Sequence, residues 1–221
     1  MKKMFCLIGL TGAGKSTYLN YILKYKKDYN LDNLNRLVYH TTRKPRPGEK
    51  EGVDYYFAKM KDKPVSLVGY TSENGGYLLR SNPDLIEERT YTTMNNGVVY
   101  YYTTTDCVTE DYYICAPSIE QLSSYLDYFG PDKIVVIEID TEIKTRIRRV
   151  MEKRTTCDKD VYELCRRILQ EVDDWEKADK DGMVAKRINN YLLIDNTIES
   201  KFQENANEIL EYIKEQYYKD C

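Results

Sequence analysis

Gly9-Leu10-Thr11-Gly12-Ala13-Gly14-Lys15-Ser16-Thr17 is the stretch of sequence that decides the fold. It has the pattern G-x-x-x-x-G-K-[ST], which describes a loop whose backbone N–H groups cradle phosphate. The apolar run 4–8 precedes it, and an amphipathic segment with Leu19, Ile22 and Leu23 follows it. This order predicts a strand over 3–8, a phosphate-binding loop, and a helix over 15–27.

The residue types in this loop have a physical explanation. Glycines allow the backbone to adopt conformations closed to other residues and to approach a ligand closely. The helix that follows adds unpaired N–H groups and the positive end of its dipole. Lys15 is expected to reach the β- and γ-phosphates of a nucleoside triphosphate, and the Ser16 hydroxyl to ligate Mg²⁺. The predicted triphosphate-binding residues are Gly9, Thr11, Gly12, Ala13, Gly14, Lys15, Ser16 and Thr17. The alternative is a glycine-rich turn with an incidental lysine, and seven consistent features in one short span disfavour it.

Composition limits the class of protein. A chain of 221 residues can form one α/β domain with an insert. The net charge of -3 offers no broad basic face, so nucleic acid is not an expected partner. No apolar run is long enough to cross a membrane or to act as a signal peptide, so we expect neither a membrane partner nor export. The six cysteines form no C-x-x-C pair, which favours reduced thiols in a cytoplasmic protein, and the single histidine, His40, excludes a His-rich metal site.

Strand and helix patterns alternate along the chain, which indicates a parallel sheet with crossover helices. Further strands are predicted over 36–40, 85–93, 98–105, 112–116, 133–140 and 190–195. Helices are predicted over 119–129, after Thr141, over 161–178 and over 198–217. Ser118 is the predicted N-cap of the first of these helices, with Gln121 as its capping-box partner. Residues 62–83 are the least readable part, with short strands possible on either side of Asn74-Gly75-Gly76, and residues 155–160 are expected to be mobile.

The stretch from His40 to Phe57 is expected to be a long loop, and it contains a distinctive sequence motif. It contains every fixed position of T-T-R-x-x-R-x-G-E-x-x-G-x-D-Y-x-F, from Thr41 through Glu49 to Phe57, and so resembles the signature of the guanylate kinase family. The resemblance implies an α/β P-loop three-layer fold with a parallel central sheet, a small β-rich monophosphate-binding insert and a helical lid. The domains expected from it are a core (1–40, 106–140 and 179–221), the insert (41–105), and the lid with its flanking helices (141–178).

The family resemblance also implies an activity: ATP-dependent phosphorylation, with Mg²⁺, of GMP or dGMP. It implies that Arg43, Arg46 and Tyr55 hold the acceptor phosphate. Two arginines three residues apart in a proline-stiffened loop can converge on a phosphate with bidentate forks. Glu49 is expected to orient the arginines or the nucleotide loop.

In this family a glutamate and a hydroxyl read the guanine edge, and the hydroxyl follows a Y-G-[ST] segment. Glu88 is the preferred carboxylate here, with Glu87 one residue away. Tyr101-Tyr102-Thr103 resembles Y-G-T with its glycine replaced, so Tyr101 would contact the phosphate and Thr103 the base. A competing register uses Tyr77, but Leu78-Leu79 then stands where a hydroxyl is needed.

A basic helix after residue 141 resembles the family's lid. Arg146 and Arg149 are one turn apart and share a helix face, while Arg166 and Arg167 begin a second basic cluster. Cationic groups that close over the transferring phosphoryl group would stabilise its charge, and either Arg166 or Arg167 could supply one of them. A solvated amphipathic helix is the alternative interpretation. The predicted catalytic residues are Lys15, Arg43, Arg146, Arg149, Arg166 and Arg167.

The chain departs from the family at one clear place. The acidic D-x-D segment of the family is replaced by Cys115-Ala116-Pro117, and Asp140 is a possible substitute carboxylate. Two alternative functions remain: a kinase for another nucleoside monophosphate, and a catalytically inactive guanylate kinase-like binding module. A signalling GTPase is disfavoured because the chain has no N-K-x-D motif.

Overall fold

The computed structural model describes residues 1–46, 48–59, 67–71, 77–81, 84–93, 97–154, 157–180 and 186–219. The chain forms two compact units, one made of Met1–Arg36 with Glu110–Cys221 and the other of Leu37–Thr109. Three features expected from the sequence lie wholly or partly outside the described residues: the turn at 74–76, the Asn95-Asn96 part of the hairpin turn, and the start of the 155–160 segment.

The first unit contains a five-stranded sheet in the order β11-β10-β1-β9-β2, and every neighbouring pair is parallel. Its strands are β1 (Lys3–Ile8), β2 (Leu34–Arg36), β9 (Tyr112–Cys115), β10 (Ile134–Asp140) and β11 (Asn190–Asp195). The expected parallel central sheet is therefore confirmed. Because β1 lies in the middle and the chain runs first to one side of it and then to the other, the loop after β1 opens at the topological switch point. Ligands of open α/β sheets bind at such points.

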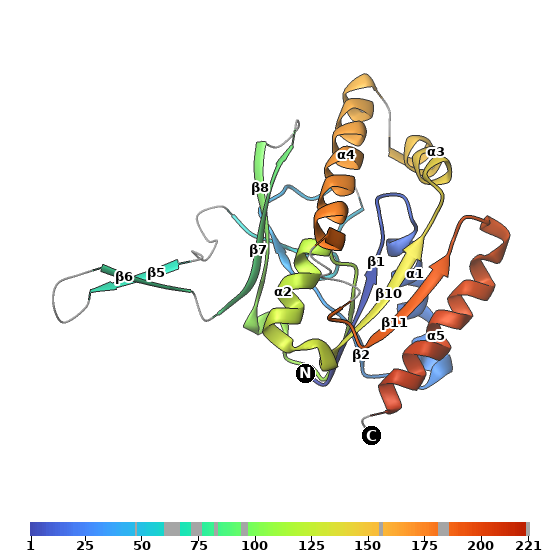
Figure 1. Ribbon diagram of the computed structural model, residues 1–221, viewed down its shortest axis with the longest axis horizontal. Helices are drawn as coiled ribbons and strands as arrows, with labels where there is room; N and C mark the ends of the chain where they lie inside the picture. The colour runs from blue at the N-terminus through green and yellow to red at the C-terminus, as the bar shows by residue number, and fades with distance from the viewer. Residues whose placement is uncertain are drawn as a thin grey trace. The chain divides into compact units, whose positions relative to one another are not determined.

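Helices cover both faces of this sheet, which is why its inner strands β1, β9 and β10 are nearly continuous apolar runs rather than alternating ones. All six residues of β1 are buried. Phe5 and Leu7 share a core cluster with Tyr18 and Ile22 of the first helix and with Ile209 of the last. Figure 1 shows α1 behind the sheet and α2 in front of it. The helices are α1 (Lys15–Tyr25), α2 (Ile119–Phe129), α3 (Ile143–Arg154), α4 (Asp158–Lys180) and α5 (Phe202–Tyr218).

The second unit is made of short strands. Its four-stranded sheet has the order β4-β3-β8-β7, and β5 and β6 form a separate antiparallel pair. The long pair β7–β8 sets the register of the functional side chains, with Glu87 opposite Thr103 and Arg89 opposite Tyr101. The strands are β3 (His40–Thr41), β4 (Tyr56–Phe57), β5 (Leu67–Thr71), β6 (Tyr77–Ser81), β7 (Leu85–Thr93) and β8 (Gly97–Thr104). Short 3₁₀ helices connect elements of both units: η1 (Lys26–Tyr29), η3 (Thr105–Cys107), η4 (Pro131–Lys133) and η5 (Glu199–Lys201).

The N-cap and the end of α2 agree with the prediction from the sequence. The Ser118 hydroxyl accepts a hydrogen bond from the Gln121 backbone N–H at 3.2 Å, so Ser118 is the N-cap, and the helix ends before Gly130 as expected. The Gln121 amide donates to the Tyr125 hydroxyl at 2.6 Å.

The predicted strand over 36–40 is wrong. β2 ends at Arg36 in the parallel sheet, and β3 begins at His40 in the other unit. The β-favouring residues between them form the passage from one unit to the other. Tertiary context has overridden local propensity there.

Among the described residues, none of the helices combines the length and the apolar character needed to span a bilayer.

Candidate functional site

The loop between β1 and α1 has no room for side chains at two of its glycines. Gly9 and Gly12 have φ angles of 139° and 85°. A Cβ at Gly9 would lie 2.4 Å from the Ile139 carbonyl oxygen, and one at Gly12 would lie 2.5 Å from the Arg146 carbonyl oxygen. Both clashes are with backbone, so the loop needs glycine for conformation and for close approach.

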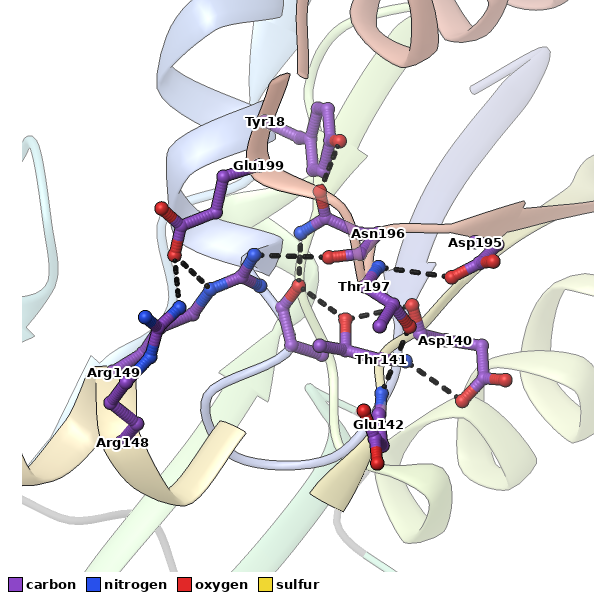
Figure 2. Close-up of polar contacts among 11 residues, drawn as sticks. Tyr18, Asp140, Thr141, Glu142, Arg148, Arg149, Asp195, Asn196, Thr197 and Glu199 are labelled. Carbon is purple, nitrogen blue, oxygen red and sulfur yellow. Dashed lines mark hydrogen bonds and ion pairs between the residues drawn. The ribbon is translucent and has the colours of Figure 1, made fainter. Parts of the chain in front are cut away.

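Buried polar side chains fix the backbone of this loop through hydrogen bonds. The Ala13 carbonyl oxygen accepts hydrogen bonds from Asn196 Nδ2 at 2.7 Å and from Thr141 Oγ1 at 3.1 Å. Asn196 Oδ1 in turn accepts from the Tyr18 hydroxyl at 2.8 Å. Figure 2 shows this chain of contacts, which ties the ends of β10 and β11 to the loop and to α1. Sequence reasoning missed Asn196, because it follows its strand without a recognised motif.

The first turn of α1 carries the polar residues expected to contact phosphate and metal. Gly14 is the N-cap, with a φ of 109°. The Lys15 ammonium folds back over the loop and donates to the Gly9 carbonyl and, at 3.2 Å, to the Leu10 carbonyl. Ser16 and Thr17 are exposed at the start of the helix. A hydroxyl in that position is accessible to a metal ion bound next to phosphates.

Thr11 makes an unexpected contact with α4. Its backbone N–H donates to the Glu171 carboxylate at 2.6 Å, and its hydroxyl donates to the other carboxylate oxygen. Arg167 lies beside this pair, with its guanidinium 3.4 Å from the Thr11 hydroxyl and 4.0 Å from Glu171. A carboxylate therefore occupies the loop N–H group at which the sequence predicts phosphate. Nothing in the sequence pattern pointed to Glu171.

The four arginines of α3 and α4 that the sequence singles out have different surroundings. Arg146 is buried and donates to the carbonyls of Thr11 at 3.2 Å and Thr141 at 3.1 Å. Burial lowers the pKa of Arg146, and the negative charges of Glu171 and Asp140 oppose this. Arg146 therefore lies directly against the phosphate loop.

Of the other three arginines, one contacts the phosphate loop and two bind partners elsewhere. Arg149 donates to the Asn196 carbonyl at 3.0 Å and lies 3.5 Å from Glu199 (Figure 2). Arg166 pairs with Glu163 on its own helix, through bonds of 3.0 and 2.9 Å that raise its pKa. Of the two neighbours left open by the sequence, Arg167 is the one that reaches the loop.

In the second unit, Arg43 lies at the centre of a dense network. Its Nη1 and Nη2 atoms donate to the two oxygens of Glu49 at 3.0 and 2.9 Å. Nε donates to the Tyr101 hydroxyl at 3.0 Å, and Nη1 also donates to the Lys44 carbonyl at 2.7 Å. These bonds use four of the five N–H donors of the guanidinium. The fork expected to hold phosphate is present, and in this structure it holds the carboxylate of Glu49.

The pairing shifts the pKa values of Arg43 and Glu49 in opposite directions. Burial alone would lower the pKa of Arg43 and raise that of Glu49. The hydrogen bonds between them reverse both effects, so the pKa of Arg43 is raised and that of Glu49 is lowered. Glu49 also accepts the backbone N–H of Arg46 at 2.7 Å. Glu49 thus fixes both the guanidinium and the turn that follows it, while the Arg46 side chain is exposed.

Aromatic residues enclose the Arg43 guanidinium. It lies 5.2 Å from the ring centre of Tyr55. Tyr55 and Tyr101 are neighbours, with ring centres 5.9 Å apart. The structure therefore brings together Arg43, Glu49, Tyr55 and Tyr101, with Arg46 on the adjoining turn.

Glu87, and not Glu88, is the carboxylate beside Thr103. The Thr103 hydroxyl donates to Glu87 at 2.8 Å, and both residues are buried. Glu88 lies opposite Tyr102 in the register and points to the other face of β7, because successive side chains of a strand alternate. Glu88, preferred from the sequence as the base-reading carboxylate, therefore lies on the face opposite to Thr103, whereas Glu87 lies beside Thr103. Arg89, which the sequence analysis did not select, lies 3.2 Å from Glu87 and 5.5 Å from the Tyr101 ring.

The place of the family's acidic segment is apolar. Cys115 is buried, with its sulfur 3.8 Å from that of Cys6 on the adjacent strand. Asp140, the suggested substitute, is exposed and accepts the Thr141 backbone N–H at 2.8 Å.

A parallel sheet with a glycine loop after its central strand, backed by a basic helix pair, defines an α/β P-loop protein. Comparison with known proteins narrows this class. Residues 1–66 match the family model described as "Guanylate kinase". The guanylate kinase of Desulfotalea psychrophila is 42% identical over 60 residues, and that of Schizosaccharomyces pombe is 45% identical over 60 residues.

The extent of these matches differs between sequence and structure. The first alignment covers 27% of this chain and 27% of the relative, and the second covers 27% and 28%, so the matched stretch is about a quarter of each relative's length. A crystal structure of guanylate kinase from Anaplasma phagocytophilum matches 99% of this chain and 88% of its own, with a TM-score of 0.52 and 19% identity. The amino-terminal part of the chain is thus guanylate kinase-like in sequence, and the whole chain has the fold of a solved guanylate kinase.

Proposed function

We propose that this chain is an ATP-dependent nucleoside monophosphate kinase that converts GMP or dGMP to the diphosphate. The observation that carries the proposal is the arrangement along β8. Tyr101 and Thr103 are two residues apart on one face, Tyr101 bonded to Arg43 and Thr103 bonded to Glu87. A cationic, hydroxyl-bearing end and a buried carboxylate end are thus separated by about 7 Å, which suits the phosphate and base ends of one nucleotide.

The carboxylate end favours guanine. The Watson–Crick edge of guanine presents two N–H donors side by side, and an ionised carboxylate is an acceptor-only group with two oxygens. Adenine lacks the ring N–H, so it would offer Glu87 one donor fewer than guanine does. A site built to bond a particular substrate group rejects analogues that lack it, because its buried polar atoms are left unpaired. The proposed monophosphate-binding residues are therefore Arg43, Arg46, Glu49, Tyr55, Tyr101, Thr103 and Glu87, with Glu87 in place of Glu88.

The phosphate loop supplies the donor side. Its N–H groups and Lys15 would hold the β- and γ-phosphates of ATP, and Thr11 would exchange the Glu171 carboxylate for a phosphate oxygen. Ser16 is the residue proposed to hold Mg²⁺, and the close backbone packing at Gly12 leaves the loop shaped for phosphate. The metal, when bound, neutralises charge on the phosphates.

Phosphoryl transfer needs positioning and charge stabilisation more than covalent help from the protein. Arg146 and Arg167, the two lid arginines that reach the loop, are the proposed clamps on the transferring group. Arg149 supports the loop through Asn196, and Arg166 needs to leave Glu163 before it can take part.

A coupled assay with ATP and each nucleoside monophosphate tests the proposal. Turnover is expected with GMP and dGMP. Lys15→Ala should abolish it, and Arg43→Ala should raise the KM for GMP more than that for ATP. Turnover with a different monophosphate and not with GMP would show that the acceptor is that other nucleotide. Tight GMP binding without turnover would indicate an inactive binding module.

The proposal includes a cytoplasmic location. The five cysteines that lie within the described residues are free thiols, which a reducing compartment would preserve.

A further inference from the structure

His40, Asp106 and Cys107 form a cluster that the proposed kinase reaction does not use. One potential ligand atom from each residue, an imidazole nitrogen, a carboxylate oxygen and a thiol sulfur, lies within 4.8 Å of the other two. It is the single such group of three found within the ranges that the structure describes. The sequence pattern gave no sign of it, because His40 is far along the chain from the adjacent Asp106 and Cys107.

The backbone brings these side chains together. His40 pairs with Tyr102 across β3 and β8, and its ring stacks on the Tyr102 ring with centres 4.8 Å apart and planes 6° apart. After β8 the chain turns through η3, which carries Asp106 and Cys107. The Thr105 N–H donates to the Asp84 carbonyl at 2.9 Å, and this bond fixes where the turn begins.

The donor set suits a borderline-soft divalent metal. Zinc binds thiolate sulfur at about 2.3 Å and imidazole nitrogen at about 2.0–2.1 Å, so neighbouring ligand atoms in a tetrahedral site are about 3.5 Å apart. The three atoms therefore need to approach one another by about 1.3 Å at most. Asp106 is exposed, so its side chain is free of packing constraints and can make this movement. Calcium and magnesium prefer oxygen ligands alone and fit this set poorly.

The negative charges around the cluster also favour a cation. The carboxylates of Asp106 and Glu51 act on His40, and those of Asp106 and Glu87 act on Cys107. Zinc binds a neutral imidazole and a deprotonated thiolate, so binding at this cluster would release the thiol proton of Cys107.

We propose that His40, Asp106 and Cys107 bind a zinc ion, with water in the fourth position. This site is separate from the Ser16 position proposed for Mg²⁺, and it needs neither nucleotide. It would join the start of β3 to η3, the turn that follows β8, and β8 is the strand that carries Tyr101 and Thr103. Metal at this position would therefore stiffen the β8 strand on which the proposed acceptor site is built.

The first experiment is a zinc titration of the full chain, freed of metal by a chelator, against a chromophoric zinc chelator, without nucleotide. We expect one tight equivalent in the wild type. Cys107→Ser and His40→Gln should each weaken it at least tenfold, while Cys165→Ser, which removes an exposed cysteine elsewhere, should not change it. Replacing zinc with Co²⁺ should give a thiolate-to-cobalt absorption band that Cys107→Ser removes. Equal zinc affinity in all four proteins would overturn the proposal.

A second measurement avoids the risk that a variant fails to fold. The wild-type chain is alkylated with and without zinc, and the modified cysteines are identified by mass spectrometry. Zinc should protect Cys107 several-fold and leave Cys165 unchanged. Alkylation of Cys107 at the same rate with and without zinc would contradict the site.

Discussion

The contact between Glu171 and Thr11 predicts that removing one carboxylate strengthens ATP binding. Glu171 accepts two hydrogen bonds from Thr11, one from the loop N–H at 2.6 Å and one from the hydroxyl. A phosphate oxygen that approaches Thr11 has to replace this carboxylate. Glu171→Gln keeps the size of the side chain and removes the charge, so the competing contact becomes weaker while the loop is unchanged.

The size of the effect follows from these bonds. A hydrogen bond to a charged group contributes about 1.5–3 kcal/mol, roughly twice as much as a neutral bond. The Glu171 side chain is 31% exposed, so solvent reduces this difference. We expect a net gain of about 1 kcal/mol in triphosphate binding, which is about a fivefold lower Kd. Loss of a negative charge next to Arg146 and Arg167 acts in the same direction.

Isothermal titration with a non-hydrolysable ATP analogue and Mg²⁺ measures this Kd directly. Glu176→Gln is the matched control, because it removes the same charge from an exposed position of the same helix. The control should bind as the wild type does. If Glu171→Gln leaves the Kd unchanged or raises it, the carboxylate does not compete with phosphate, and the contact is structural.

Three further predictions concern other parts of the two units. Glu87→Gln should raise the KM for GMP about 10- to 100-fold, because a buried charged acceptor is lost, while Glu88→Gln should leave it within about twofold in the same coupled assay. Gly12→Ala should destabilise the chain by at least about 1 kcal/mol more than Gly48→Ala in thermal unfolding. Both glycines have similar positive φ angles, 85° and 87°, but only the first Cβ would meet the backbone of α3. Because the folded-state pKa of Glu49 is depressed, its stabilising effect is present above the ordinary pKa of about 4.3 and is lost as the pH falls below it. Glu49→Gln should therefore flatten the acid side of the profile of stability against pH, and an unchanged profile would contradict this.

The elements that could be read from the sequence are those specified by local signals. β1, the glycine loop and α1 follow from an apolar run, three glycines and a helical repeat. The N-cap at Ser118 and the stop at Gly130 define α2 for the same reason. The passage at 37–39 was misread because its residues favour strands in isolation, whereas their structure depends on where the chain leaves the parallel sheet.

The sequence favours Glu88 for the proposed base end, whereas the structure pairs Glu87 with Thr103, and the reason for the difference is geometrical. Glu87 and Glu88 are adjacent glutamates, so only the register of β7 against β8 distinguishes them. A connection one residue longer or shorter would exchange their faces. Residues 94–96, which form that connection, lie outside the described part of the chain. Glu171 was beyond prediction for a similar reason, because its contact with Thr11 joins residues 160 positions apart.

The two units share a feature that bears on how substrates bind. In each unit a carboxylate of the same unit occupies groups suited to phosphate: Glu171 on Thr11, and Glu49 on Arg43. Each substrate phosphate would then exchange one anion for another instead of filling an empty cationic site. Such exchange would make phosphate binding weaker than the number of hydrogen-bond donors in each site suggests. It would also keep the Arg43 guanidinium in position when no phosphate is bound. It also limits the cost of buried positive charge, since an unpaired buried guanidinium would be strongly destabilising. If this is the role of both carboxylates, Glu171→Gln and Glu49→Gln should affect different substrates, the first lowering the Kd for ATP and the second changing only that for GMP.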